Sequence, residues 1–247
     1  MFQFAHHQSL LIRKLVLLFF LGITNTLYAQ RNVILIIADD IGTDYFGCYE
    51  NHKDTINAPN LNRLLNKGVR FKNATANPIC SPTRAGIFTG RYCFRTGVGT
   101  SVGDGNANAT PLDTNELSLP RLMRLNFQNQ IKMAHIGKWH LHQDTPATAM
   151  LIPNKMGYDF YSGNFKALVN NYYHWKKITN GSYQMINNYA TVETTNDAVS
   201  WIKSQSTNPF FLWVSYNAPH EPYHYAPTNL HSFPNLSGTP QDINNNP

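Results

Sequence analysis

The fold of this chain is indicated first by the stretch NVILIIADD at residues 32–40. After Asn32, residues 33–38 form a continuous apolar run rich in β-branched side chains, which is typical of a strand buried on both faces of a parallel sheet. The run stops at two adjacent carboxylates, Asp39 and Asp40. A buried strand that ends in this way predicts a sheet edge that carries polar chemistry.

Two further runs of the same kind, at residues 131–137 and 209–215, predict two more interior strands. Helices are predicted at 59–67, 81–89, 118–127 and 193–203. Asn57 and Gly68 bound the first, Pro82 marks the start of the second, Ser118 caps the third, and the fourth is amphipathic. We also expect a short strand at 69–72, a loop at 97–110, loops and short strands at 141–187, and an unstructured tail from Pro227. Strands that alternate with helices indicate an α/β fold with a largely parallel sheet.

Polar residues follow each of the three predicted interior strands at the point where the strand ends. They are Asp39 and Asp40 after the first, Lys138 and His140 after the second, and His220 after the third. In open α/β sheets, ligands bind outside the carboxyl ends of the strands. We therefore expect these side chains to converge, although they lie far apart in the sequence.

The most chemically informative stretch is NPICSPTRAG at residues 77–86. Pro82 fits the first turn of a helix, which places Cys80 at the helix N-terminus, where unpaired amides favour anions. Arg84, one turn later, adds a permanent cation. This pattern indicates a reactive centre for a tetrahedral oxyanion such as sulfate or phosphate. The alternative is a structural cysteine in front of an ordinary helix.

Cys80, Pro82 and Arg84, with residues 85–86 and 89–91, resemble the Cys-x-Pro-x-Arg motif of the type I sulfatases, a formylglycine-dependent family of the alkaline-phosphatase-like superfamily. The resemblance implies an alkaline-phosphatase-like mixed, largely parallel sheet flanked by helices. It also implies that a maturation enzyme, formylglycine-generating or equivalent, converts Cys80 to Cα-formylglycine, the catalytic aldehyde.

The stretch Ala38-Asp39-Asp40 resembles the family motif that supplies two carboxylate ligands to a divalent cation. The resemblance implies Ca²⁺, with Mg²⁺ as the other choice, bound by Asp39, Asp40 and the modified side chain of Cys80. Hard oxygen ligands suit both ions. Without a metal, the two aspartates would be a solvated turn or a helix cap.

Two further elements resemble the family, Gly-Lys-Trp-His at 137–140 and Pro-His-x-Pro at 219–222. The resemblance implies that Lys138 binds the sulfate ester and that His140 hydrogen-bonds the formylglycine hydrate. It also implies that His220 binds sulfate and protonates the leaving group, while Arg84 stabilises charge on the sulfuryl oxygens. We interpret His135, His142 and His174 as structural or surface residues, and His224 lies close to His220 but lacks its setting between two prolines.

Residues 1–29 have the features of a secretory signal peptide. Arg13 and Lys14 precede an apolar run at 15–23, which is too short to span a bilayer comfortably, and Ala29 provides an acceptable cleavage site. The alternative is an uncleaved N-terminal anchor. We expect a secreted or periplasmic protein without a stable membrane anchor, since both alternatives place the catalytic part outside the cytoplasm.

The composition is that of a mildly basic secreted globular protein. The formal charge of +6 becomes +4 when the two basic residues of the signal peptide are removed. This balance suits an anionic substrate, and the absence of a Lys/Arg run argues against nucleic acid as a partner. Once Cys80 is modified, Cys48 and Cys93 remain as a disulfide pair or as two free thiols.

The resemblance covers nearly all of residues 31–225, the N-terminal part of the family pattern. The family's later Asp-Asn pair has no match in Asp242 or residues 244–246. We therefore expect residues 30–247 to be an incomplete N-terminal catalytic domain, C-terminally truncated, that is poorly stable or inactive alone. The function implied is hydrolysis of the sulfate ester of a small molecule or saccharide. The alternatives are a phosphonate or phosphodiester hydrolase of the same superfamily and an inactive truncated homologue.

Overall fold

A computed structural model describes residues 32–49, 55–103, 108–127 and 130–231, and those from Val33 onward belong to one compact unit. Its six strands are β1 (Val33–Asp39), β2 (Lys132–Gly137), β3 (Phe160–Gly163), β4 (Trp175–Thr179), β5 (Ser182–Ile186) and β6 (Phe210–Pro219). The α-helices are α2 (Pro59–Leu65), α3 (Cys80–Thr89), α4 (Cys93–Thr96), α5 (Leu119–Phe127), α6 (Ile152–Lys155) and α7 (Ala190–Ser204). Short 3-10 helices lie at Thr43–Tyr45, Gly47–Tyr49, Ala147–Leu151 and Thr228–Leu230.

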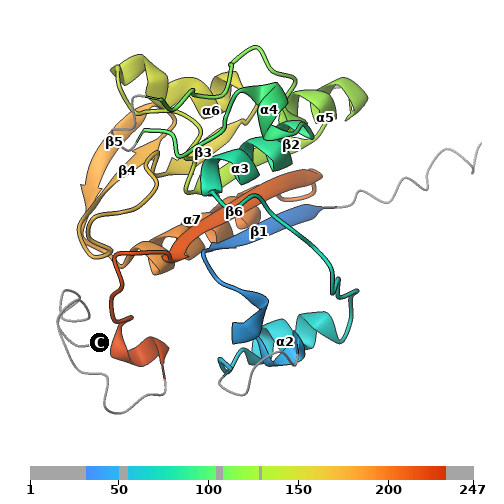
Figure 1. The fold of residues 1–247 in the computed structure, drawn as a ribbon, viewed down its shortest axis with the longest axis vertical. Coiled ribbons are helices and arrows are strands. Elements are labelled where there is room, and N and C mark those ends of the chain that lie inside the picture. The colour runs from blue at the N-terminus through green and yellow to red at the C-terminus, as the bar shows by residue number, and fades with distance from the viewer. Residues whose placement is uncertain (1–31, 50–54, 104–107, 128–129, 232–247) are drawn as a thin grey trace, which may run out of the picture. The chain divides into compact units, whose positions relative to one another are not determined.

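The six strands form one mixed sheet in the order β1-β6-β2-β3-β4-β5 (Figure 1). The strands β1, β6, β2 and β3 run parallel to one another, β4 pairs antiparallel with β3, and β4 and β5 form an antiparallel hairpin that extends the sheet. The predicted α/β fold with a largely parallel sheet flanked by helices is therefore confirmed. The last of the described strands in sequence order, β6, lies between β1 and β2.

Successive side chains of β6 alternate between two apolar cores, one on each face of the sheet. In β6, Phe211 and Trp213 pack into one core with Phe88 of α3, whereas Leu212 and Val214 pack into the other with Trp201 of α7. Successive side chains of a strand point to opposite faces of a sheet, so a continuous apolar run fills both cores. The predicted interior strands at 131–137 and 209–215 are confirmed.

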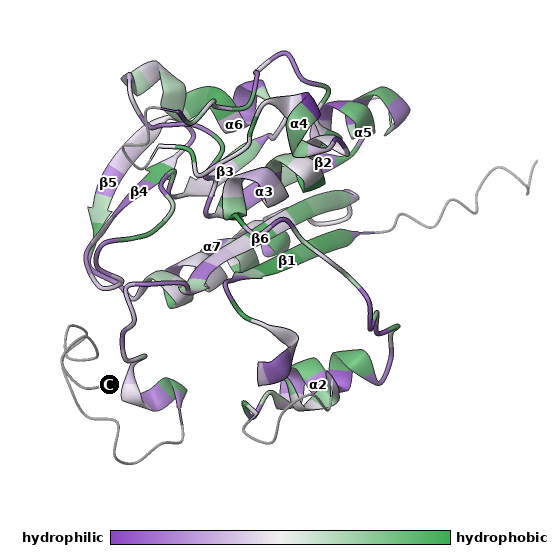
Figure 2. Cartoon of the chain, in the orientation of Figure 1, coloured by the Kyte–Doolittle hydropathy of each residue, from purple (hydrophilic) through white to green (hydrophobic). Residues whose placement is uncertain are grey.

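The prediction that the first strand is buried on both faces was wrong. Ile34 is 46% exposed and Ile36 is 61% exposed, and β1 lies at the end of the described sheet. Their register partners on β6 are Leu212 and Val214, which α7 covers. Helix α7 packs on β6, β2 and β3, so the face of β1 that carries Ile34 and Ile36 stays open although the strand is apolar up to Ala38 (Figure 2).

The predicted helices all occur, with α3 beginning at Cys80. The Ser118 hydroxyl accepts a hydrogen bond from the Arg121 N–H at 3.3 Å, which confirms the predicted cap of α5. The predicted strand at 69–72 was wrong: this segment has no regular structure, and Val69 and Phe71 are 79% and 72% exposed. Two apolar side chains without a covering layer do not sustain a strand.

Several sequence predictions concern residues outside the described ranges. The signal peptide at 1–29 and the segment around Asp242 are among them. Across the described residues, no helix combines the length and the apolar character that crossing a membrane requires. Cys48 and Cys93 are free, half-buried thiols in the structure.

Candidate active site

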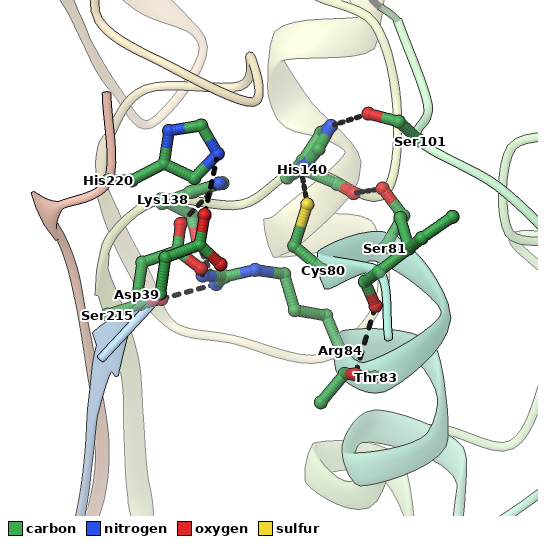
Figure 3. Close-up of polar contacts among 12 residues, drawn as sticks. Asp39, Cys80, Ser81, Thr83, Arg84, Ser101, Lys138, His140, Ser215 and His220 are labelled. Atoms are coloured by element: carbon green, nitrogen blue, oxygen red, sulfur yellow. Dashed lines mark hydrogen bonds and ion pairs between the residues drawn. The ribbon is translucent and has the colours of Figure 1, made fainter. Parts of the chain in front are cut away.

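The carboxyl ends of β1, β2 and β6 and the N-terminus of α3 bring the chemistry-bearing side chains together (Figure 3). A pocket of about 540 Å³ lies at this edge, and its walls include Asp39, Asp40, Cys80 and Arg84. The expectation that polar residues from separate strand ends converge is therefore met by the geometry. What each residue does there stays a prediction.

Cys80 faces a histidine that a serine contacts on its other side. The Cys80 Sγ lies 3.1 Å from the His140 Nδ1, and the Ser101 Oγ lies 3.1 Å from the His140 Nε2. The Ser81 hydroxyl donates to the His140 carbonyl oxygen at 2.8 Å and accepts from the Val102 N–H at 3.1 Å. Contacts to the His140 ring and to the His140 carbonyl oxygen thus hold the imidazole against the side chain of residue 80.

The environment of Cys80 keeps its thiol protonated. Burial raises the pKa of the Cys80 thiol; the Lys138 ammonium opposes this effect, the Asp39 carboxylate adds to it, and Arg84 opposes it. Burial is the larger influence, although two cations lie nearby. An unmodified Cys80 is therefore a poor thiolate nucleophile at neutral pH, because the thiolate is the reactive form.

Arg84 is buried, with 2% of its surface exposed, and ties three segments together. Its Nη1 donates to the Lys138 carbonyl oxygen at 2.8 Å and to the Ser215 hydroxyl, and its Nη2 lies 3.4 Å from the Asp39 Oδ1. Burial lowers the pKa of the Arg84 guanidinium and the Asp39 carboxylate counteracts this effect. Its buried Nε has no hydrogen-bond partner among the described residues, so one donor remains for an oxyanion.

Lys138 is fully buried and forms an ion pair with Asp39. The Lys138 N–H also donates to the Ser215 carbonyl oxygen at 2.8 Å, which fixes the end of β2 against β6. In this conformation the Lys138 ammonium is directed at Asp39, as Figure 3 shows. The predicted contact between Lys138 and a substrate therefore requires this ion pair to be shared with the substrate or opened.

Asp40 and His220 form a second, more exposed pair. The His220 Nε2 lies 3.3 Å from the Asp40 Oδ2, and the Asp40 side chain is 64% exposed. The Tyr172 hydroxyl donates to the His220 carbonyl oxygen at 2.8 Å, and the His220 Nδ1 lies 3.0 Å from the carbonyl oxygen of Glu221. His220 is therefore positioned at the rim of the site, with one ring nitrogen directed at a carboxylate.

The backbone at the site adopts conformations that are rare elsewhere. Asp40 and His140 have φ angles of 60° and 52°, in the left-handed region that costs a non-glycine residue about 1–2 kcal/mol. Gly137 has a φ of 109°, and a Cβ there would overlap the carbonyl oxygen of Ser215. These residues follow the ends of β1 and β2, where Asp40 contacts His220 and His140 contacts Cys80.

Asp39 and Asp40 are the residues that would hold the divalent cation that the motif implies. Asp39 and Asp40 offer hard oxygen atoms of the kind that Ca²⁺ and Mg²⁺ prefer. Both oxygens of Asp39 contact cationic side chains, which marks its position as one where positive charge is held. Over the described ranges, however, no group of three or more His, Cys, Asp or Glu side chains is placed to hold a metal ion. The oxygen donors of Asp39 and Asp40 fit such an ion, and by themselves they would supply only part of a calcium coordination shell.

Sequence reasoning missed two residues of the site, Ser215 and Ser101. Ser215 is fully buried and contacts Arg84 and Lys138, and a serine that ends the apolar run of β6 was the available signal. Ser101 lies in a glycine-rich loop, where no periodic pattern marks a functional side chain.

The contacts of His135, His142 and His174 are those of structural or surface residues, as the sequence analysis interprets them. Burial lowers the pKa of His135 to about 3, and its ring stacks on Trp213. His142 contacts the Leu112 carbonyl oxygen, and His224 stacks on Tyr172. His174 is exposed and contacts Asn187.

Comparison with known proteins gives the family. A family model described as Sulfatase matches residues 31–245. The chain belongs to the sulfatase family. Arylsulfatase D of Homo sapiens is 39% identical over 116 residues, which are 45% of this sulfatase chain and 19% of that protein. The N-acetylglucosamine-6-O-sulfatase of Bacteroides thetaiotaomicron is 29% identical over 211 residues, 83% of this chain and 34% of that protein.

A solved structure agrees with the fold of the sulfatase chain. Ps i-CgsB, crystallised in complex with k-i-k-neocarrahexaose, superposes with a TM-score of 0.71 at 30% identity over 85% of this chain and 49% of that chain. The sulfatase chain therefore spans between 19% and 49% of the length of these three proteins.

Proposed function

We propose that the chain is the N-terminal catalytic part of a sulfuric ester hydrolase that cleaves the sulfate ester of a small molecule or saccharide. One observation carries the proposal: Cys80 of the family motif lies against His140 beside two buried cations, Arg84 and Lys138. A sulfate ester carries negative charge on its sulfuryl oxygens. Buried cations and unpaired donors that face such oxygens stabilise that charge in the transition state.

Cys80 is the residue proposed for conversion to formylglycine by a maturation enzyme. When present, the hydrated aldehyde supplies an oxygen nucleophile in place of the protonated thiol. The role of His140 follows from its position, since its Nδ1 lies at hydrogen-bond distance from the side chain of residue 80 and can accept or return a proton there. Ser101 keeps the other ring nitrogen oriented.

Arg84 and Lys138 are proposed to bind the sulfuryl oxygens. The unpaired Nε of Arg84 supports this role, because a buried donor without a partner gains most from an anionic acceptor. Asp39 holds both cations in place while the site is free of substrate. Asp39 and Asp40 would hold Ca²⁺ or Mg²⁺, with position 80 as a further ligand, and the ion would supply positive charge toward the same oxygens.

His220 is proposed as the general acid that donates a proton to the departing alcohol oxygen. Its Nε2 lies at the rim of the site, 3.3 Å from the Asp40 Oδ2, and an imidazole placed there can donate a proton to a departing oxygen. The signal-peptide features of residues 1–29 support a secreted or periplasmic location, where residues 30–247 would act. Relatives named for aryl and sugar sulfates support both substrate classes.

The experiment is to co-express the chain with a formylglycine-generating enzyme and to measure peptide mass at position 80. Hydrolysis of 4-nitrophenyl sulfate and bis(4-nitrophenyl) phosphate is then compared. We expect the aldehyde at position 80 and weak turnover of the sulfate, because the domain is incomplete and poorly stable, and this turnover should fall to the uncatalysed background in Cys80→Ala. Cys93→Ala is the matched control, since Cys93 is a half-buried thiol outside the site. Turnover of the phosphate diester alone, or an unmodified thiol with no turnover, would contradict the proposal.

A further inference from the structure

The segment 164–172 borders the site from one proposed catalytic histidine to the other. The His140 N–H donates to the Phe165 carbonyl oxygen at 3.1 Å, and the Tyr172 hydroxyl donates to the His220 carbonyl oxygen at 2.8 Å. If His220 protonates the departing alcohol, that alcohol must lie on the His220 side of the sulfur atom. The surface between this segment and the residues after His220 is therefore where the remainder of the substrate would lie.

A hollow of about 350 Å³ occupies this surface, within the size range of small-molecule sites. Its lining residues come from segment 164–172 and from the three residues that follow His220: Leu168, Asn170, Glu221, Pro222 and Tyr223. The hollow thus begins one residue beyond the proposed proton donor. Tyr172 also ties the two segments that form its walls, through its bond to the His220 carbonyl.

The lining residues offer the chemistry that recognises a polyhydroxylated ring. Tyr223 is 60% exposed, so an aromatic face is available for the apolar face of a sugar. The Glu221 carboxylate accepts hydrogen bonds, and the Asn170 amide both donates and accepts. Both side chains are exposed. A sterol or another wholly apolar alcohol would desolvate the carboxylate without a hydrogen bond in return, which is unfavourable.

A second hollow of about 420 Å³ adjoins the first and shares Leu168 and Asn170 with it. Its walls also include Lys176 and Asp144, whose Nζ and Oδ2 lie 2.7 Å apart, and His174. Polar side chains thus continue from the first hollow into the second, beyond the space that one sugar ring fills. This continuity favours a saccharide of more than one unit over a compact aryl alcohol.

We propose that Asn170, Glu221 and Tyr223 form the subsite for the saccharide that leaves from sulfur, with the adjoining hollow receiving a further sugar unit. The inference rests on the proposed function, since it places the sugar by the role of His220. It names the substrate class as a sulfated saccharide. It also assigns substrate preference to residues outside the Cys80, Lys138 and His220 motifs.

The test uses the matured full chain and three substrates: N-acetylglucosamine 6-sulfate, N-acetylgalactosamine 6-sulfate and 4-nitrophenyl sulfate. The quantity measured is kcat/KM for the better sugar sulfate divided by kcat/KM for the aryl sulfate. We expect Asn170→Ala and Tyr223→Ala each to lower this ratio about fivefold or more, as the loss of one stacking or hydrogen-bonding contact predicts. Tyr92→Ala is the control: Tyr92 is 75% exposed and lies outside both hollows, so the ratio should not change.

The outcomes separate the two proposals. Turnover of the aryl sulfate with no turnover of either sugar sulfate would overturn the subsite and leave the sulfatase function in place. Turnover of a sugar sulfate with an unchanged ratio in both hollow variants would do the same. No turnover of any sulfate by the matured chain would overturn the proposed function, and the subsite with it.

Discussion

Replacing Asp39 by asparagine tests the electrostatic basis of the site. The Asp39 carboxylate contacts both Lys138 and Arg84, whose side chains are 0% and 3% exposed. Asparagine keeps the shape of the side chain and removes the charge, so two buried cations lose their shared counter-ion. Breaking a buried ion pair by removing one partner costs about 3–5 kcal/mol, because the remaining charge stays desolvated.

The expected result for Asp39→Asn is a loss of about 3–5 kcal/mol in the free energy of unfolding. For a chain of this size, each kcal/mol corresponds to about 2–4 °C in Tm, so we expect Tm to fall by about 6–20 °C. Urea unfolding followed by tryptophan fluorescence measures the change, since Trp139 and Trp213 are buried in the core beside the site. The measurement is made without added divalent cations, so that ion pairing alone is compared.

Two variants sharpen this measurement. Asp40→Asn is the matched control, because the Asp40 side chain is 64% exposed and its pair with His220 should be worth less than about 1 kcal/mol. The double variant Asp39→Asn with Lys138→Met removes one unpaired cation and should recover part of the lost stability. A loss below about 1 kcal/mol for Asp39→Asn, or no recovery in the double variant, would refute the view that Asp39 neutralises buried charge.

Three further predictions follow from particular contacts. Ser215→Ala removes a hydrogen bond to the Arg84 guanidinium and should lower kcat/KM for 4-nitrophenyl sulfate about tenfold or more, with Ser215→Thr as the conservative variant that restores it. Gly137→Ala places a Cβ on the carbonyl oxygen of Ser215 at a φ of 109° and should cost more than about 4 kcal/mol, measured by urea unfolding; a stable variant would show that the strand ends can separate. Acid should destabilise the chain through His135, whose pKa falls from 6.5 to about 3 on folding. The unfolded state then binds the extra proton, so the stability that neutral His135 contributes is complete above pH 6.5 and is lost as the pH falls toward 3, by about 2 kcal/mol at pH 5. His135→Phe should flatten this dependence, and an unchanged slope between pH 6.5 and 5 would contradict the assignment.

The sequence predicts the strands and helices whose apolar residues follow a clear pattern. It predicts less well which other elements cover them. The alternation in β2 and β6 follows from their apolar runs, and the polar residues after each strand mark the edge where the site lies. The exposure of β1 does not follow from its own residues, since it depends on where α7 stops. Likewise, Ile36 is an apolar residue of the kind that fills cores, yet its side chain is exposed.

Within the site, residue type predicts which residues belong to the site better than it predicts which of them contact one another. Cys80 and Arg84 are recognisable from spacing along one helix. The ion pair of Lys138 with Asp39 depends on the register of β2, β6 and β1, which local sequence does not encode. Ser215 belongs to the site through that same register, as the partner of both Gly137 and Ile37.

The central place of β6 has a consequence for the order of events during synthesis. β1 and β2 have no direct pairing in the described sheet and are joined through β6, so their ends cannot align until Ser215 has left the ribosome. At about 5–20 residues per second, the 135 residues between Cys80 and Ser215 take roughly 7–27 s to translate. Throughout that interval Cys80 belongs to a chain whose sheet is incomplete. The maturation proposed for Cys80 would therefore have at least this interval before β6 pairs between β1 and β2.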